Sequence, residues 1–177
     1  LGLVPALERR FAVLEDVGAG NVLFVDRDAR RVLGDVFADL PVQGKKTPVI
    51  MQANRNGFFY VIDRANGKLV SAKHYVDGVN WASSVDMKTG MPVEAPGNAK
   101  RPGMKRKASD ICPNLLGGKN WMPMSYDQGT GLVYMPTLNL CMDLEGIQAG
   151  YKRGAFYLGV NFDLGKVGPG GHGGGVK

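Results

Sequence analysis

The spacing of apolar residues changes along the chain, and the change divides it near residue 40. Before that point, residues 6–17 (ALERRFAVLEDV) and 28–40 (DARRVLGDVFADL) mix charged and apolar residues as amphipathic helices do, with a strand-like run at residues 21–26 (NVLFVD). After it come short runs rich in apolar, aromatic and branched residues, at 47–53 (TPVIMQA), 58–63 (FFYVID) and 68–76 (KLVSAKHYV). The pattern predicts helices on both sides of a short strand before residue 40, and β-strands after it.

Two kinds of turn signal separate the later strands. Residues 54–57 (NRNG) contain an Asn-Gly pair, which is a strong hairpin signal. An Asp-x-x-x-Gly pattern begins at Asp63, Asp86 and Asp127, where the aspartate can cap the turn and the glycine can adopt a positive φ. Because these turns are spaced unevenly, by 23 and then 41 residues, they favour propeller blades separated by insertions over a simple array of hairpins.

The end of the sequence and its composition complete this picture. Residues 165–177 (GKVGPGGHGGGVK) are too rich in glycine for a core element, so we expect a flexible loop at which the fold is truncated. The 177 residues are enough for one domain, and 44% apolar with 21% charged residues is a globular balance. No apolar run approaches the roughly 20 residues of a membrane helix, so the sequence predicts no membrane span.

The net charge of +6 is concentrated in residues 100–107 (KRPGMKRK). Such a cluster is either a patch for nucleic acid or an acidic partner, or a solvated loop. Pro102 and Gly103 interrupt it, and no aromatic residue lies within it to stack on bases. We therefore favour the solvated loop and predict no nucleic-acid partner.

Cys112 and Cys141 are the only cysteines, and neither lies in a CxxC or Cys/His spacing. His74 and His172 are isolated, so a zinc site is not predicted. The two cysteines are either buried free thiols or a disulfide, and the residues alone do not decide between these. A disulfide would contribute about 3–4 kcal/mol by restricting the unfolded chain, and it would imply an oxidising compartment.

Two polar residues next to glycines are candidates for binding a ligand. Arg55 lies in the 54–57 turn, where its guanidinium is either an ordinary exposed group or a fork of donors for a planar ligand with several oxygens. Asn120 and Trp121 follow Gly117-Gly118-Lys119, where the glycines permit close backbone approach. An amide beside an indole suits a flat cofactor but also suits core packing.

Five motifs between about Asp39 and Gly171 bear on these alternatives. In order they are residues 56–75 (NGFFYVIDRANGKLVSAKHY), 111–114 (ICPN), 117–121 (GGKNW), 123–137 (PMSYDQGTGLVYMPT) and 139–143 (NLCMD). Their order and spacing resemble the quinoprotein alcohol dehydrogenases, a group that includes methanol dehydrogenases and periplasmic ethanol dehydrogenases. GGKNW and FFYVIDR look closer to the ethanol-type enzymes.

The resemblance implies an all-β fold and specific site residues. The family fold is a propeller of eight four-stranded blades, of which residues 41–177 would supply about three. In the family, the arginine of the (D/N)RNG turn contacts the oxygens of pyrroloquinoline quinone (PQQ), and an asparagine eight residues after the first cysteine bonds the same cofactor. Arg55 and Asn120 occupy those places, and Cys112 and Cys141 match the family disulfide. No role carries over to Lys119 or Trp121.

The resemblance also implies an activity. Family enzymes oxidise primary alcohols to aldehydes in the periplasm and pass the electrons to a cytochrome c. An aspartate removes the alcohol proton, a Ca²⁺ or lanthanide ion polarises the quinone, and hydride passes to the quinone.

The residues before position 41 depart from this family. The catalytic aspartate belongs to a W-D-Y-(D/A)-G segment that has no match here; Asp28 lies near its place, but its surroundings differ, so we assign no catalytic base. The metal ligands cannot be located either. A frameshift, a misassigned start or a fusion junction would explain residues 1–40, and the alternative is a divergent N-terminus. The sequence therefore predicts part of a PQQ-dependent alcohol dehydrogenase that is inactive alone, and the alternative is a propeller-type binding module without a cofactor.

Overall fold

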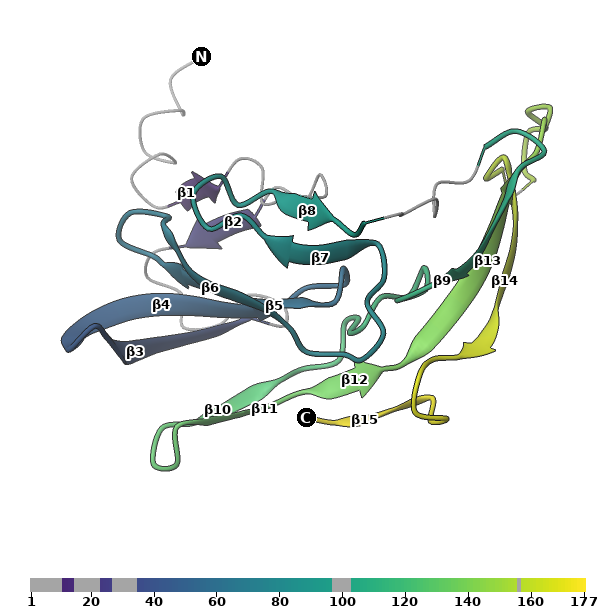
Figure 1. The fold of residues 1–177 in the computed structure, drawn as a ribbon. Coiled ribbons are helices and arrows are strands. Elements are labelled where there is room, and N and C mark those ends of the chain that lie inside the picture. The colour runs from purple at the N-terminus through teal and green to yellow at the C-terminus, as the bar shows by residue number, and fades with distance from the viewer. Residues whose placement is uncertain (1–10, 15–22, 27–34, 97–102, 156) are drawn as a thin grey trace, which may run out of the picture.

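The computed structural model describes residues 11–14, 23–26, 35–96, 103–155 and 157–177, and all regular elements in them are β-strands (Figure 1). The strands are β1 (Phe11–Leu14), β2 (Leu23–Asp26), β3 (Val36–Val42), β4 (Lys45–Ala53), β5 (Phe58–Asp63), β6 (Leu69–His74), β7 (Ala82–Val85), β8 (Pro92–Glu94), β9 (Lys107–Ile111), β10 (Ser125–Asp127), β11 (Leu132–Tyr134), β12 (Pro136–Leu138), β13 (Leu140–Gly146), β14 (Val160–Val167) and β15 (Gly174–Val176). The predicted all-β class is thus confirmed. No helix among the described residues is long and apolar enough to cross a membrane.

The largest sheet has four antiparallel strands in the order β3-β4-β5-β6, which is the size of a propeller blade. Burial alternates along β5, so that Phe58, Tyr60 and Ile62 face one side of the sheet and are almost fully buried. The hairpin of β7 and β8 covers this side, because Ala82 and Val85 of β7 complete the same core. The period-2 pattern of FFYVID therefore encodes a strand with one buried face.

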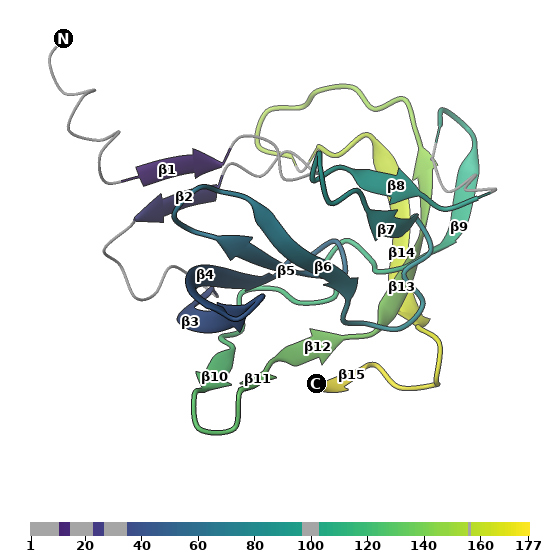
Figure 2. The same ribbon diagram turned by 60° about the vertical axis from the view of Figure 1, so that its left-hand side comes forward.

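A second sheet of three strands has the order β14-β13-β9 and lies apart from the first, on the right of both views (Figure 1, Figure 2). Its core is smaller and contains Ala108, Ile111 and Met142. The pairs β1-β2, β7-β8, β10-β11 and β12-β15 form two-stranded sheets. The sheets do not close on one another, so the described residues form an open arrangement.

The predicted helices before residue 40 are wrong wherever the structure describes them. Phe11–Leu14 is strand β1, paired with the β2 strand that the sequence predicted correctly. Val36–Val42 is strand β3, whose backbone pairs with β4 along its whole length, from Val36 opposite Met51 to Val42 opposite Lys45. Pairing with a neighbouring strand overrides a weak helical pattern. β3 also contains residues on both sides of the boundary drawn at residue 40, and the origin of residues 1–40 stays a prediction.

The glycine-rich end is not entirely a loop. Residues 165–167 complete β14, and Gly174–Val176 form β15, which pairs with β12 in the register Thr137 opposite Gly175. The buried amide of Asn139 donates hydrogen bonds to the carbonyl oxygens of Pro169 (2.7 Å) and His172 (3.1 Å). Main-chain pairing needs no side chain from the glycines, so composition alone gave the wrong expectation.

The predicted turns are present. In each Asp-x-x-x-Gly turn the glycine N–H donates to the carbonyl oxygen of the aspartate: Gly67 to Asp63 at 2.7 Å, Gly90 to Asp86 and Gly131 to Asp127 at 2.8 Å. All three glycines have a φ between +72° and +74°. The local signal was therefore sufficient to predict these turns.

Candidate functional site

The 54–57 turn that carries Arg55 is covered by other parts of the chain. It is closed by Gly57 N–H donating to Asn54 O at 3.1 Å, and the Asn54 side chain accepts from Asn56 N–H at 3.1 Å. The buried Tyr75 hydroxyl donates to Asn54 O at 2.8 Å, and the indole N–H of Trp81 donates to Asn56 O at 3.0 Å. Two aromatic side chains thus fix the main chain on both sides of Arg55.

The 115–121 loop packs directly on this turn. Gly117 has a φ of +83°, and a Cβ built on it would lie 2.6 Å from Arg55 Cβ and 2.7 Å from Arg55 Cα. A Cβ on Gly118 would lie 2.9 Å from the Tyr75 hydroxyl oxygen. The Gly118 N–H donates to Arg55 O at 3.0 Å. The glycine pair is therefore required for the turn and the loop to approach this closely.

Arg55 and Asn120 are bound to neighbouring carbonyl groups of this loop. The guanidinium Nη2 of Arg55 donates to Leu115 O at 2.8 Å, and the amide Nδ2 of Asn120 donates to Leu116 O at 3.0 Å. Asn120 Oδ1 accepts from Trp121 N–H at 2.9 Å. The structure thus brings the two predicted cofactor contacts, 65 residues apart in the sequence, to one loop. The Trp121 side chain is 83% exposed.

Two oppositely charged residues near this site, Lys119 in the loop and Asp35 before β3, are buried. Lys119 is 3% exposed, and its ammonium Nζ donates to Asn120 O at 3.2 Å. Asp35 is 7% exposed; burial raises its pKa to about 6, while a hydrogen bond with the Gln52 side chain and the charge of Lys119 act in the opposite direction. Burial lowers the pKa of Lys119, and the charge of Asp35 opposes that effect. Each charge thus partly offsets the cost of burying the other.

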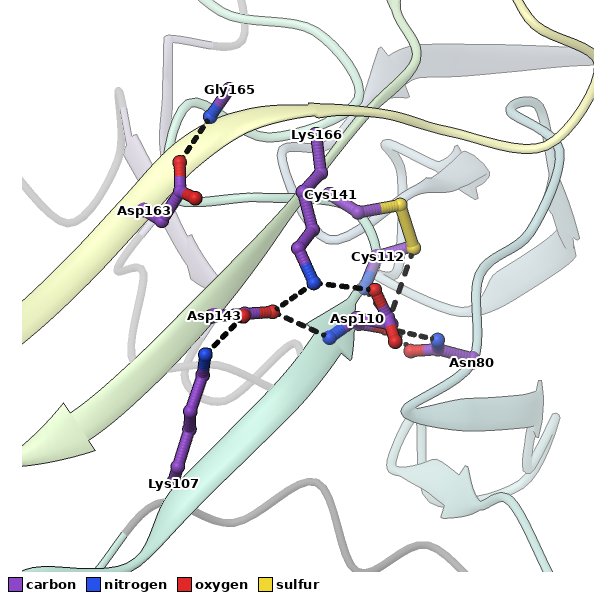
Figure 3. Close-up of polar contacts among 9 residues, drawn as sticks. All are labelled: Asn80, Lys107, Asp110, Cys112, Cys141, Asp143, Asp163, Gly165 and Lys166. Carbon is purple, nitrogen blue, oxygen red and sulfur yellow. Dashed lines mark hydrogen bonds and ion pairs between the residues drawn. A yellow bond between two sulfur atoms is a disulfide. The ribbon is translucent and has the colours of Figure 1, made fainter.

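Cys112 and Cys141 form a disulfide with a Cα–Cα distance of 4.4 Å (Figure 3). Both cysteines are buried, and because their sulfur atoms are bonded to each other the alternative of two free thiols is excluded. The disulfide joins the chain before the 115–121 loop to β13, and it therefore holds the base of that loop in place.

A cluster of charged residues lies next to the disulfide. Asp143 on β13 is 6% exposed and binds the ammonium groups of Lys107 and Lys166, each at 2.7 Å. Asp110 N–H donates to Asp143 Oδ1 at 3.0 Å, and the Asn80 amide donates to Asp110 O at 2.6 Å (Figure 3). The two lysines hold the pKa of Asp143 well below its usual range. An open cavity of about 220 Å³ lies beside Lys107 and Asp143 and does not include Arg55 or Asn120.

Two further sequence predictions concern residues that the structure describes only in part or not at all. Lys107, the last residue of the basic cluster, binds Asp143, whereas residues 97–102 lie outside the described residues. Asp28 also lies outside them. Within the described ranges, no group of three or more His, Cys, Asp or Glu side chains could hold a metal ion.

The donors at the turn and the loop fit a flat anion with several oxygens. Arg55 is exposed and uses one of its five N–H donors on Leu115 O, and a guanidinium presents the others in one plane. The half-buried Asn120 amide adds a further donor group next to it. The pattern of neighbouring glycines pointed to these two residues as candidates. It did not reveal Tyr75, Trp81 or the Asp35–Lys119 pair, since each contributes through contacts with residues distant in the sequence.

Curated proteins similar to this chain share its central motifs. It is 44% identical over 126 residues to a lanthanide-dependent methanol dehydrogenase of Methylacidiphilum fumariolicum, covering 71% of this chain and 20% of that protein. It is 46% identical over 125 residues to a quinoprotein ethanol dehydrogenase of Pseudomonas aeruginosa, covering 68% and 20%. The chain thus spans about a fifth of the length of these relatives. No family model matches it.

Solved structures show the same relationship in three dimensions. A europium-containing methanol dehydrogenase superimposes with a TM-score of 0.71 at 41% identity, over 82% of this chain and 25% of that one. A quinohemoprotein alcohol dehydrogenase from Pseudomonas putida HK5 gives a TM-score of 0.62 at 41% identity, over 73% and 19%. The open sheets are accordingly a partial propeller.

Proposed function

Because this chain belongs to the quinoprotein alcohol dehydrogenase family, we propose that it forms part of the cofactor site of such an enzyme, with Arg55 and Asn120 as contacts to PQQ. The observation that carries the proposal is the docking of the 54–57 turn on the 115–121 loop, through Gly118 N–H and Arg55 O at 3.0 Å. When bound, the quinone supplies the acceptor for the hydride of the alcohol.

The roles of the two residues follow from their chemistry. Arg55 keeps a permanent positive charge and a planar fork of donors, which would bind quinone oxygens and stabilise negative charge that develops on them. Asn120 would donate a neutral hydrogen bond and orient the same ligand. Because the turn and the loop are fixed to each other, neither side chain needs to move far to bind.

The wider activity is proposed on the basis of the family. The complete enzyme would oxidise primary alcohols to aldehydes with a Ca²⁺ or lanthanide ion beside the quinone, and a cytochrome c would accept the electrons. The names of the relatives, which include methanol and ethanol dehydrogenases and a lanthanide-dependent enzyme, support the substrate class and the metal. The Cys112–Cys141 disulfide supports an oxidising compartment, for which we propose the periplasm.

A titration with PQQ tests the proposed contact. We expect Arg55→Ala to weaken quinone binding by roughly tenfold or more, because a hydrogen bond to a charged group contributes about 1.5–3 kcal/mol. Arg64→Ala is the matched control, since Arg64 also lies in a turn but interacts with Asp39 (3.9 Å) and the Phe37 ring. The change in quinone absorbance measures the affinity of each variant.

Two outcomes would contradict the proposal. Absence of quinone binding by the wild-type chain would favour a binding module without a cofactor, and equal loss in both arginine variants would remove the specific role of Arg55. We expect no dye-linked alcohol oxidation by the purified chain with PQQ and Ca²⁺ or La³⁺, since it spans about a fifth of its relatives. Turnover under these conditions would show that the chain suffices for catalysis.

A further inference from the structure

Lys119, between Gly118 and Asn120, is unusual for a lysine because it is only 3% exposed. Burying an ammonium group is costly unless hydrogen bonds and a nearby opposite charge compensate it. Its Nζ donates to the main-chain oxygen of Asn120 at 3.2 Å, and its charge interacts with that of Asp35. Lys119 thus folds back on the residue that follows it rather than extending into solvent.

Asp35 provides the opposite charge from a distant part of the chain. It immediately precedes β3 and is 7% exposed. A hydrogen bond with the Gln52 side chain on β4 lowers the pKa of its carboxyl group. Because β3 and β4 pair along their length, Asp35 is fixed to the four-stranded sheet. The attraction between the Asp35 and Lys119 charges therefore acts between this sheet and the 115–121 loop.

The same polar contacts continue to the turn that carries Arg55. Gln52 Oε1 accepts a hydrogen bond from Asn54 Nδ2 at 3.3 Å, and Asn54 Oδ1 in turn accepts from Asn56 N–H. On the other side, Gly118 N–H donates to Arg55 O. Gln52 and Asn54 thus support the turn side of this contact, and Lys119 lies on its loop side.

We propose that Lys119 is a positioning residue for the cofactor site: its buried ammonium group, bound to the Asn120 main-chain oxygen, fixes the main chain of Asn120 and so the direction of the Asn120 side chain. This inference rests on the proposed function, since it assigns a role toward the same ligand. Lys119 acts through Asn120 rather than by touching the ligand, because its Nζ is bound to Asn120 O and its side chain is buried.

A double-mutant cycle separates positioning from other roles. PQQ affinity is measured by absorbance titration of the full chain in wild type, Lys119→Met, Asn120→Ala and the double variant. If Lys119 acts through Asn120, Lys119→Met weakens binding by about tenfold in the wild-type background and by less than about twofold when Asn120 is already alanine. Equal losses in both backgrounds, or no loss in either, overturn the proposal.

Lys166→Met is the matched control for a general loss of stability. Lys166 also supports a buried carboxylate, through its 2.7 Å contact with Asp143, but it lies in the β14-β13-β9 sheet. This variant should bind PQQ within about twofold of wild type. A loss as large as that of Lys119→Met would assign both effects to stability and overturn the proposal. If Lys119→Met does not fold, Lys119→Gln, which keeps a donor without the charge, takes its place in the cycle.

A measurement without the cofactor keeps this inference distinct from the proposed function. Amide hydrogen exchange reports the opening of the 115–121 loop, where Gly118 N–H is bound to Arg55 O. Lys119→Met should accelerate amide exchange in this loop by about tenfold, because the loop then opens more often. Exchange at residues 107–111 should stay unchanged. Unchanged loop exchange overturns the positioning role even if PQQ binds. Faster loop exchange in a chain that binds no PQQ would support the role of Lys119 in ordering Asn120. The same result would reject the quinone as the ligand.

Discussion

The 54–57 turn and the 127–131 turn both reverse the chain between two antiparallel strands, but only the first is covered by other parts of the molecule. In the 127–131 turn the capping bonds are local: Asp127 accepts from Gly129 N–H at 2.8 Å and from the Thr130 hydroxyl at 3.0 Å. All five of its residues are exposed. The 54–57 turn instead receives hydrogen bonds from Tyr75, Trp81 and Gly118.

The difference separates a turn that only reverses the chain from one that places a side chain. An exposed turn with local bonds leaves its side chains free to move, because nothing else limits the main chain. The covered turn is held by hydrogen bonds from three residues distant in the sequence, so the main chain that carries Arg55 is fixed relative to the 115–121 loop. A contact with a rigid ligand requires such fixed positions.

Two glycines, one packed against the covered turn and one within the exposed turn, should give the largest contrast. Gly117→Ala would place a Cβ 2.6 Å from Arg55 Cβ on a residue with a φ of +83°, so strain and overpacking together should cost about 2–5 kcal/mol. Gly131→Ala has a φ of +72° but nothing within 4 Å, so only the backbone strain of about 1–2 kcal/mol remains. Urea unfolding measures both variants. Equal losses would mean that the loop does not pack tightly on the turn.

The pH dependence of stability should differ in sign between the aspartates of the two regions. The folded-state pKa of Asp35 is about 6, against roughly 3.9 in an unfolded chain, so the folded state binds more protons between these values. Its contribution is therefore full below about pH 4 and lost as the pH rises through about 6, a change of about 2–3 kcal/mol. The difference in unfolding free energy between wild type and Asp35→Asn, followed from pH 4 to pH 7, measures this loss.

Asp127 provides the opposite case. Hydrogen bonds from Gly129 N–H and the Thr130 hydroxyl lower its pKa, so its contribution is present at neutral pH and is lost as the pH falls. The corresponding difference for Asp127→Asn should therefore have the opposite slope. Parallel slopes for the two variants would mean that Asp35 is not buried as described.

The smallest effects concern single hydroxyl groups. Tyr75→Phe removes the buried donor to Asn54 O and should cost about 1–2 kcal/mol in urea unfolding. Thr130→Ala removes an exposed donor to Asp127 and should change stability by less than about 0.5 kcal/mol. If Thr130→Ala were the more costly variant, the distinction between a covered and a free turn would fail.

Much of this fold could be predicted because its signals are local. The alternation in FFYVID, the Asn-Gly pair and the three Asp-x-x-x-Gly turns each specify strands and reversals within a few residues, and the structure contains all of them. The errors occurred where local signals were weak. The segment containing Val36 has a helix-like mix of residues, yet it pairs with β4, and the glycine-rich end still contributes β15.

The sequence by itself determined the family, the turns and the residue types that suit a planar anion, because these depend on motifs of neighbouring residues. Only the tertiary structure decided that Cys112 and Cys141 are joined, that the Arg55 turn is covered by Tyr75 and Trp81, and that Lys119 and Asp35 are both buried. Burial and charge compensation depend on which distant segments pack together. The spacing of neighbouring residues does not specify which distant segments pack together.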